Sequence, residues 1–167
     1  MKKVIIIRYG ELWLKGKNRG YFEKMFETNI KRAIKGIDCD FIKQCGRYLI
    51  ENFSEYDADE LISRLKKVFG MHTMSLAYET DADMQSIFQT AKAVCKEEGT
   101  FKVESHRGDK RYPKTSVEIS RELGGMLLSA FPKLKVNVHD PDFTVRVDIR
   151  ENGKALVFGE FIQGANG

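Results

Sequence analysis

The sequence predicts an α+β fold, with helices and strands mixed along the chain and organised as two domains. Segments that alternate with a period of two are interspersed with segments whose apolar residues have helical spacing. The chain has 167 residues, of which 42% are hydrophobic and 31% charged, which is enough for two small cores. Only Glu79 to Asp83 separates the last predicted strand of the first half from the first helix of the second. We therefore expect domains at residues 1–79 and 80–167.

The first half is predicted to be a compact βαββαβ unit. The apolar faces of its helices have helical spacing, and its two middle strands meet at a tight Cys45–Gly46 connection. The expected elements are a strand at Val4–Ile7, a helix at Tyr21–Ile34, strands near Cys39–Gln44 and Arg47–Phe53, a helix around Leu61–Phe69 and a strand at Met74–Tyr78. This order is the ferredoxin-like split βαβ pattern, an antiparallel sheet with two helices on one face.

The second half is predicted to open with a helix and to end with strands. Thr115 followed by Glu118 has the spacing of a capping box, which predicts a helix that starts at once. Asn152–Gly153 is a typical hairpin dipeptide between the last two strands. The expected elements are a helix at Met84–Cys95, a short strand at Phe101–Val103, a helix from Thr115 to Ala130, and strands at Leu134–Val138, Phe143–Ile149 and Ala155–Ile162.

Two glycines interrupt the predicted helix after Thr115. Gly124 and Gly125 each cost about 1 kcal/mol relative to alanine at such a position. We therefore expect a close neighbour at both positions, first of all the sheet and second a nucleic-acid backbone.

A basic loop lies between the short strand and this helix, and we define it as Arg107–Lys114. Arg107, Lys110, Arg111 and Lys114 supply its cations, with Tyr112 among them. The free amides and the positive dipole end of the following helix should face the same side, an arrangement suited to a phosphate. The alternative is a solvated loop that only connects two elements.

The distribution of charge also predicts a polyanionic partner. Met1–Lys35 holds ten Lys or Arg against three Glu, and a second excess of positive charge lies in Lys102–Lys114, whereas the stretch between them is acidic. The total of +4 thus hides two basic patches. A membrane partner is not predicted, because no helix pairs a basic face with exposed aromatic residues.

The remaining composition favours a cytoplasmic protein without a metal site. No apolar run approaches membrane-spanning length, and the apolar start is too short for a signal peptide. The three cysteines are odd in number and lack CxxC spacing, and the three histidines lack ligand spacing, so neither a disulfide framework nor a metal site is predicted.

One stretch imitates a nucleotide-binding loop. A strand is followed by Gly10 to Gly16, then Lys17, then a helix. The P-loop needs four residues between its glycines and a Ser or Thr after the lysine, whereas this sequence has five residues there and Asn18 after the lysine. Nucleotide binding at Lys17 is therefore not expected.

The basic loop and its flanks resemble the THUMP domain, an RNA-binding module of tRNA-modifying enzymes. The match is spread over strand, loop and helix. It is carried by Phe101, Arg107, Asp109, Lys110, Tyr112, Pro113, Ser116, Glu118 and Gly124.

The start of the chain resembles the ThiI family, the tRNA 4-thiouridine synthetases (tRNA sulfurtransferases), in which a ferredoxin-like domain precedes a THUMP domain. The stretches Arg8–Leu12 and Leu14–Arg19 carry this likeness, and Gln163–Gly167 resembles the linker that leads into a PP-loop domain in that family. The resemblance implies that ATP and magnesium act in that PP-loop domain, whose Ser-Gly-Gly-x-Asp-Ser motif is absent from this sequence. The present chain would then hold no cofactor.

The resemblance further implies tRNA as the partner, held at its acceptor stem and 3′ end, with a sulfur-donating protein for the whole enzyme and a homodimer as its assembly. Tyr112 would either stack on an unpaired base or pack beside Pro113. The predicted RNA-binding residues are Lys15, Lys17, Asn18, Arg19, Arg107, Lys110, Arg111, Tyr112, Lys114 and Ser116. The alternative is a THUMP-type or protein-interaction module of another RNA-modification system, whose basic surfaces meet an acidic partner.

Overall fold

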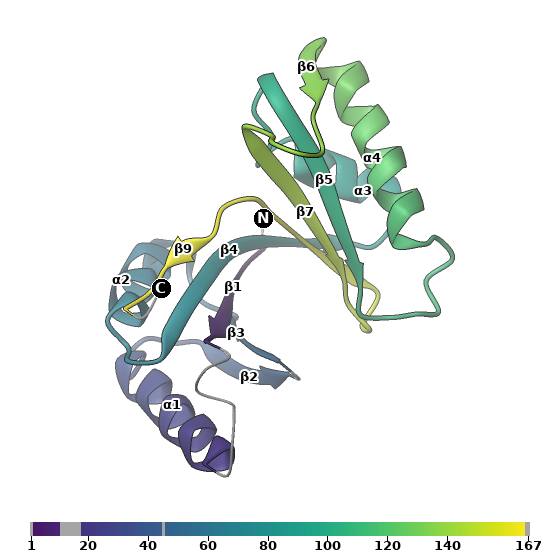
Figure 1. Ribbon diagram of the computed structural model, residues 1–167. Coiled ribbons are helices and arrows are strands. Elements are labelled where there is room, and N and C mark those ends of the chain that lie inside the picture. Colours follow the sequence, from purple (N-terminus) through teal and green to yellow (C-terminus); the bar gives the residue numbers. More distant parts are fainter. Residues whose placement is uncertain (1, 11–17, 45, 166–167) are drawn as a thin grey trace. The chain divides into compact units, whose positions relative to one another are not determined.

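A computed structural model describes residues 2–10, 18–44, 46–165 of the chain, which form two compact units (Figure 1). The first unit consists of Lys3–Leu76 and the segment that begins at Phe161. The second unit consists of Ala77–Glu160 together with Lys2. The boundary that the sequence suggests, between residues 79 and 80, lies inside a single strand, so the chain passes from one unit to the other without a loop.

The first unit has the predicted split βαβ order. Its strands are arranged as β2–β3–β1–β4, and β3 is antiparallel to both β2 and β1, with Leu49 opposite Ile6. The α+β class with a ferredoxin-like first half is thereby confirmed. The elements are β1 (Lys2–Tyr9), α1 (Arg19–Ala33), β2 (Asp40–Gln44), β3 (Arg47–Glu51), a short 3-10 helix (Glu55–Asp57), α2 (Ala58–Lys66) and the first part of β4 (Met71–Asp81).

The core of the first unit lies between the sheet and its two helices. Ile5 and Ile7 of β1 pack against Phe26 and Ile30 of α1. Residues two apart in a strand point to the same face of the sheet, and residues four apart in a helix lie on the same face of the helix, so the two pairs can meet. Gly70 contributes to this packing, since a Cβ atom there would lie 3.1 Å from the Phe26 ring. The positive φ of Gly46, +83°, allows the tight turn between β2 and β3.

The second unit combines parallel and antiparallel strands. Its strands are ordered β4–β8–β7–β5–β6, and β5 is parallel to both β6 and β7, whereas β7 and β8 form the predicted hairpin. The elements are α3 (Met84–Ala91), β5 (Glu98–Arg107), α4 (Ser116–Ala130), β6 (Lys133–Val136), β7 (Phe143–Ile149) and β8 (Lys154–Phe158). The helices α3 and α4 lie side by side in Figure 1 and share one core with the inner face of the sheet.

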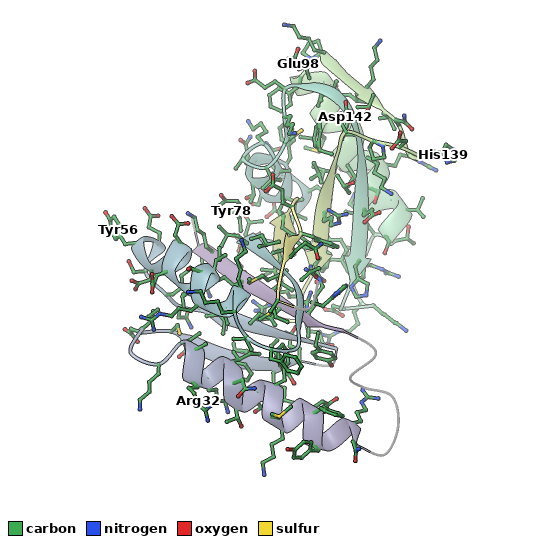
Figure 2. All side chains as sticks on the ribbon, turned by 60° about the vertical axis from the view of Figure 1, so that its left-hand side comes forward. Arg32, Tyr56, Tyr78, Glu98, His139 and Asp142 are labelled. Carbon is green, nitrogen blue, oxygen red and sulfur yellow. The ribbon has the colours of Figure 1, made fainter. Side chains whose placement is uncertain are left out.

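Three expectations for the second half need correction. The run from Ala155 to Ile162 is not one strand: β8 ends at Phe158, and Ile162–Gln163 forms a separate strand, β9, which pairs with Thr73 and Met74 of β4 in the first unit. The strand expected at residues 101–103 is ten residues long, and its first residue, Glu98, lies at the same end of the unit as Asp142 (Figure 2). The first helix of this half ends at Ala91 rather than at Cys95.

The glycines inside α4 have looser surroundings than expected. A Cβ atom at Gly124 would make an ordinary contact of 3.9 Å with Val103, and one at Gly125 would meet nothing within 4 Å. Gly124 thus packs on the sheet through Val103 of β5, at an ordinary contact distance. Packing on the sheet is not seen at Gly125, where a nucleic-acid neighbour stays a prediction. None of the helices in the described ranges is long and apolar enough to cross a membrane.

Candidate nucleic-acid interface

The basic loop connects the end of β5 to the start of α4. At its first turn Gly108 donates its amide to the carbonyl of Ile149, at 2.8 Å. A Cβ atom at Gly108 would lie 2.9 Å from that same carbonyl oxygen, so this position requires glycine. The loop is thus attached to the end of β7 at the point where β5 ends.

The start of α4 has the predicted capping box. The Thr115 hydroxyl accepts the Glu118 amide at 3.1 Å, and the Glu118 carboxylate accepts the Thr115 amide at 2.9 Å. The hydrogen bond from the Thr115 amide lowers the pKa of Glu118. Ser116, one of the predicted RNA-binding residues, is the half-buried first residue of the helix. The helix start is held by two reciprocal hydrogen bonds, and it already has a carboxylate of its own beside its positive end.

Arg107 stabilises the loop through hydrogen bonds to the loop's own backbone. Its guanidinium donates to the backbone carbonyls of Lys110 and Tyr112, at 3.4 and 3.3 Å. A side chain held in this way fixes the backbone that presents the neighbouring cations. The structure therefore adds an internal structural role to the phosphate contact that the sequence suggests for Arg107.

The other three cations of the loop differ in their partners. Lys110 is exposed, and no ion pair to it occurs within the described ranges. Arg111 donates two hydrogen bonds from its guanidinium to Asp109, at 3.0 and 3.3 Å, yet 83% of its side chain is exposed. Lys114 forms an ion pair with Glu122 of α4 at 2.6 Å. Lys110 and Arg111 are thus the most accessible positive charges of the loop.

These ion pairs also shift the pKa values of their members. The hydrogen bond from Arg111 lowers the pKa of Asp109, and the hydrogen bond to Glu122 raises the pKa of Lys114. Both shifts keep the groups charged at neutral pH. The loop therefore presents positive charges of which two have a negative neighbour: Arg111 lies beside Asp109, and Lys114 lies beside Glu122.

Tyr112 packs into the second unit. Its ring contacts the core of that unit, and its hydroxyl donates a hydrogen bond to the carbonyl of Ala82. Burial raises the pKa of this hydroxyl. Of the two roles considered for Tyr112, packing is the one that these contacts support, while stacking on a base stays a prediction.

Only part of the predicted basic site of the first unit is described. Lys15 and Lys17 lie outside the described residues, as does most of the stretch that imitates a nucleotide-binding loop. Asn18 is exposed and precedes α1, but its side chain makes no capping hydrogen bond. Arg19 is exposed and pairs with Glu23 at 3.1 Å.

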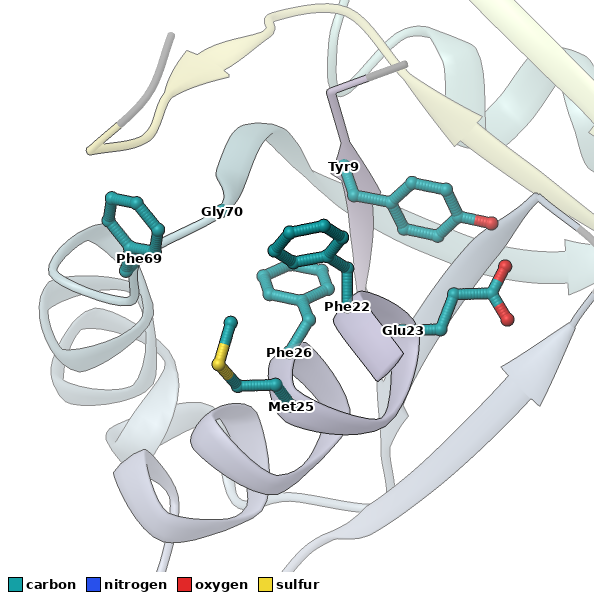
Figure 3. Close-up of a pocket in the computed structure, with 7 residues that line it drawn as sticks. All are labelled: Tyr9, Phe22, Glu23, Met25, Phe26, Phe69 and Gly70. Carbon is teal, nitrogen blue, oxygen red and sulfur yellow. The ribbon is translucent and has the colours of Figure 1, made fainter. Parts of the chain in front are cut away.

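An apolar pocket of about 330 Å³, including its open mouth, lies beside α1 and was not found from the sequence (Figure 3). Six of the described residues that line this pocket carry no charge, and the seventh, Glu23, supplies a carboxylate. The residues are Tyr9, Phe22, Glu23, Met25, Phe26, Phe69 and Gly70. The helical spacing of the apolar residues in this helix gives no sign that Phe22 and Met25 are only half-buried. This lining suits an apolar group and not a phosphate.

The fold and the basic loop define a class of protein: a module of RNA-modifying enzymes, in which a ferredoxin-like domain is followed by a THUMP domain. The family model for the ThiI ferredoxin-like domain matches residues 4–75, and the model for the THUMP domain matches residues 81–158. Together they cover nearly the whole chain. The chain belongs to the ThiI family.

The relatives match almost all of this chain and are longer than it. A protein of Caldanaerobacter subterraneus named "Probable tRNA sulfurtransferase" is 42% identical over 170 residues, which cover 100% of this chain and 44% of that protein. A 4-thiouridine synthetase solved as a complex with RNA and bound ATP is 32% identical, with a TM-score of 0.79 over 98% of this chain and 42% of that one. A crystal structure from Pyrococcus horikoshii is 30% identical, with a TM-score of 0.80 over 98% of this chain and 55% of that one. The chain thus spans about 44% of the length of the first of these relatives.

Proposed function

We propose that this chain is the RNA-holding part of a tRNA sulfurtransferase, which positions the acceptor stem and 3′ end of a tRNA for thiolation of a uridine. The observation that carries this proposal is the ThiI ferredoxin-like domain followed directly by a THUMP domain. The likeness to a synthetase solved with RNA supports RNA as the ligand.

The basic loop suits recognition of shape. Lys110 and Arg111 are exposed on a backbone that Arg107 and the capping box hold in place. Contacts from such cations to phosphates fix the position of a nucleic acid without reading its sequence. Helical RNA offers side chains little in its deep and narrow major groove, so its shape and its unpaired end are what this surface would recognise.

The proposal places the chemistry of thiolation outside this chain. ATP and magnesium would bind in a PP-loop domain, and the sequence lacks the Ser-Gly-Gly-x-Asp-Ser motif that such a domain needs. A sulfur-donating protein would serve the whole enzyme, and a homodimer would be its assembly in the cytoplasm. Sedimentation of the purified chain tests whether its own two domains suffice for the dimer.

A second function is favoured by the carboxylate partners of the loop. Arg111 and Lys114 already pair with the carboxylates of Asp109 and Glu122, so the same cations can also pair with the carboxylates of an acidic protein. The sulfur-donating partner would then be the ligand of the THUMP domain.

Binding of purified tRNA, with no other protein present, separates the two functions. We expect binding whose affinity falls by about 0.7 to 0.9 log units per phosphate contact for each tenfold increase in salt. We expect no thiolated product when ATP, magnesium and sulfide are added. Absence of binding, or a flat salt response, would favour the second function, and adenylation of tRNA by this chain alone would contradict the location of the chemistry.

A further inference from the structure

The last described segment of the chain returns to the first unit. The chain leaves β8 at Phe158 in the second unit, and Ile162 and Gln163 then pair as β9 with Met74 and Thr73 of β4. One residue further on, the amide of Gly164 donates to the carbonyl of His72 at 2.9 Å. The ferredoxin-like unit is therefore extended by a strand that lies after the THUMP domain in the sequence.

Gly164 lies against β4 without room for a side chain. A Cβ atom there would be 2.6 Å from the Met71 carbonyl oxygen and 2.3 Å from the Met71 Cγ atom. Both distances are shorter than non-bonded atoms reach, and the first involves backbone that cannot move aside cheaply. The close approach of the segment to β4 thus depends on glycine at this position.

Arg8 holds the beginning of the same segment. Its guanidinium donates to the Oγ atom of the fully buried Ser75 at 3.0 Å, and it lies 4.3 Å from the centroid of the Phe161 ring. A guanidinium at this distance from an aromatic face is attracted to it. Phe161 is 46% exposed, so the contact with the Arg8 guanidinium adds to a side chain that is only partly buried. Arg8 belongs to the N-terminal motif singled out in the sequence, and RNA binding leaves it without a role.

We propose that Phe161–Gly164 is a docking strand, held by Arg8 as its positioning residue, which anchors the chain that leaves the THUMP domain on the ferredoxin-like domain. Polypeptide that continues the chain then starts from a fixed point on the ferredoxin-like domain. In the longer relatives this would set where the remaining part of the protein begins relative to the RNA-holding domains. That last consequence rests on the proposed function, whereas the docking does not.

Hydrogen exchange of single amides, measured by NMR on the whole chain without RNA, tests the docking. In Gly164→Ala and in Phe161→Ala we expect the amide of residue 164 to exchange faster by on the order of tenfold. The first substitution makes the docked segment clash with Met71 and the second removes its contact with Arg8, so in both variants the segment opens more easily. Arg8→Ala should act in the same direction. The amides of Ile5–Ile7 report global unfolding. In Phe161→Ala they should exchange as in the wild type, because the Phe161 side chain is partly exposed and its loss should change global stability little.

Gly125→Ala is the matched control, since a Cβ atom at Gly125 meets nothing within 4 Å. It should leave the exchange of the Gly164 amide unchanged. Wild-type exchange at residue 164 in both Gly164→Ala and Phe161→Ala would overturn the proposal. So would acceleration of the same size at Ile5–Ile7 in Phe161→Ala, because the segment would then be an ordinary part of the core.

A second measurement follows the anchoring directly. A paramagnetic lanthanide-binding peptide fused after Gly167 should broaden the amide signals of Met71–Thr73 in the wild type, and this broadening should be lost in Gly164→Ala. Equal broadening in both proteins would contradict the docking role. Since neither measurement contains RNA, failure of the tRNA-binding proposal would leave both results unaffected.

Discussion

At the scale of single residues, Glu122 competes with a phosphate for the Lys114 ammonium group of the basic loop. Lys114 is already paired with this carboxylate at 2.6 Å, so an incoming phosphate must displace it. An exposed pair of this kind contributes about 0.2 to 1 kcal/mol. Glu122→Gln should therefore raise the affinity for tRNA by up to about fivefold, and it should steepen the salt dependence by up to about 0.9 log units per decade.

The control for this prediction is Glu97→Gln. Glu97 is an exposed glutamate of the same unit for which no ion pair occurs within the described ranges, so it changes the net charge by the same amount. Titration of labelled tRNA with both variants at several salt concentrations makes the comparison. Equal effects of the two substitutions would mean that net charge matters and the Lys114–Glu122 pair does not.

Tyr112 has a structural role that can be separated from stacking. Tyr112→Phe keeps the ring and removes the hydrogen bond to the Ala82 carbonyl. We expect the free energy of unfolding to fall by about 1 kcal/mol, with tRNA affinity unchanged. Denaturant unfolding and tRNA titration measure the two quantities. Tyr112→Leu then removes the ring: a loss of affinity larger than the loss of stability explains would support stacking.

The sequence could indicate which residues of the loop are cations, but not which atoms they contact. Arg107 and Lys110 look alike in the sequence, yet Arg107 is bound to backbone carbonyls and Lys110 is exposed. The difference arises because the loop folds back on itself, and no local spacing encodes that. Tyr112 is similar, since its hydroxyl partner Ala82 lies in a distant part of the sequence.

At the scale of elements, the capping box determines where α4 begins and thereby where the loop ends. Thr115→Ala removes the hydroxyl that accepts the Glu118 amide. We expect the free energy of unfolding to fall by about 1 kcal/mol and tRNA binding to weaken, because the loop loses one of its two fixed ends. Thr115→Ser keeps the hydroxyl and should restore both. If Thr115→Ser behaves like the alanine variant, the methyl group and not the cap is responsible.

The same capping box predicts a dependence of stability on pH. The pKa of Glu118 is lowered by the Thr115 amide, so its contribution to stability is present above the ordinary glutamate pKa of about 4.3 and is lost as the pH falls through the lowered value. Glu118→Gln keeps the hydrogen bond but cannot titrate. Melting temperatures measured from pH 7 down to pH 3 should therefore fall less steeply for Glu118→Gln than for the wild type. Parallel curves would contradict this role of Glu118.

The elements that the sequence predicted well are those with a local pattern. The capping box located the start of α4, and the Asn152–Gly153 dipeptide located the β7–β8 hairpin. The first residue of β9, Ile162, was merged with β8 because it is apolar like that strand and only Gly159 to Phe161 separates them. Its partner, β4, lies far earlier in the chain, and pairing across such a separation depends on tertiary packing that no short window of sequence records.

At the scale of the whole molecule, charge is distributed so that two basic segments flank an acidic one. The counts from the sequence overstate the free positive charge of each segment, because Arg19, Arg111 and Lys114 each have a carboxylate within ion-pair distance. A polyanion would replace these internal partners by its phosphates. The free energy of binding is then a difference between two sets of ion pairs.

Cooperation between the two basic segments can be measured with charge reversals. One variant reverses Lys15, Lys17 and Arg19, and the other reverses Lys110, Arg111 and Lys114, each to glutamate. If both segments contact one tRNA, each raises the local concentration of RNA at the other, so either variant alone should bind much more weakly than the wild type. Substitutions of exposed charges rarely change stability by more than about 0.5 kcal/mol each. The second variant should therefore remain folded, since Lys110 and Arg111 are exposed.

The same variants test which of the two basic segments contacts the 3′ end of the tRNA. Removal of the unpaired 3′ nucleotides should weaken binding to the wild type, because an acceptor stem that has lost its tail can no longer reach one of the two anchors. The variant whose segment contacts the tail should then lose little more when the tail is removed, since that contact is already gone. Affinities of intact and trimmed tRNA for all three proteins identify which segment holds the 3′ end. If the variant of the first segment binds both RNAs like the wild type, the ferredoxin-like domain makes no contact with tRNA, and recognition rests on the basic loop of the THUMP domain alone.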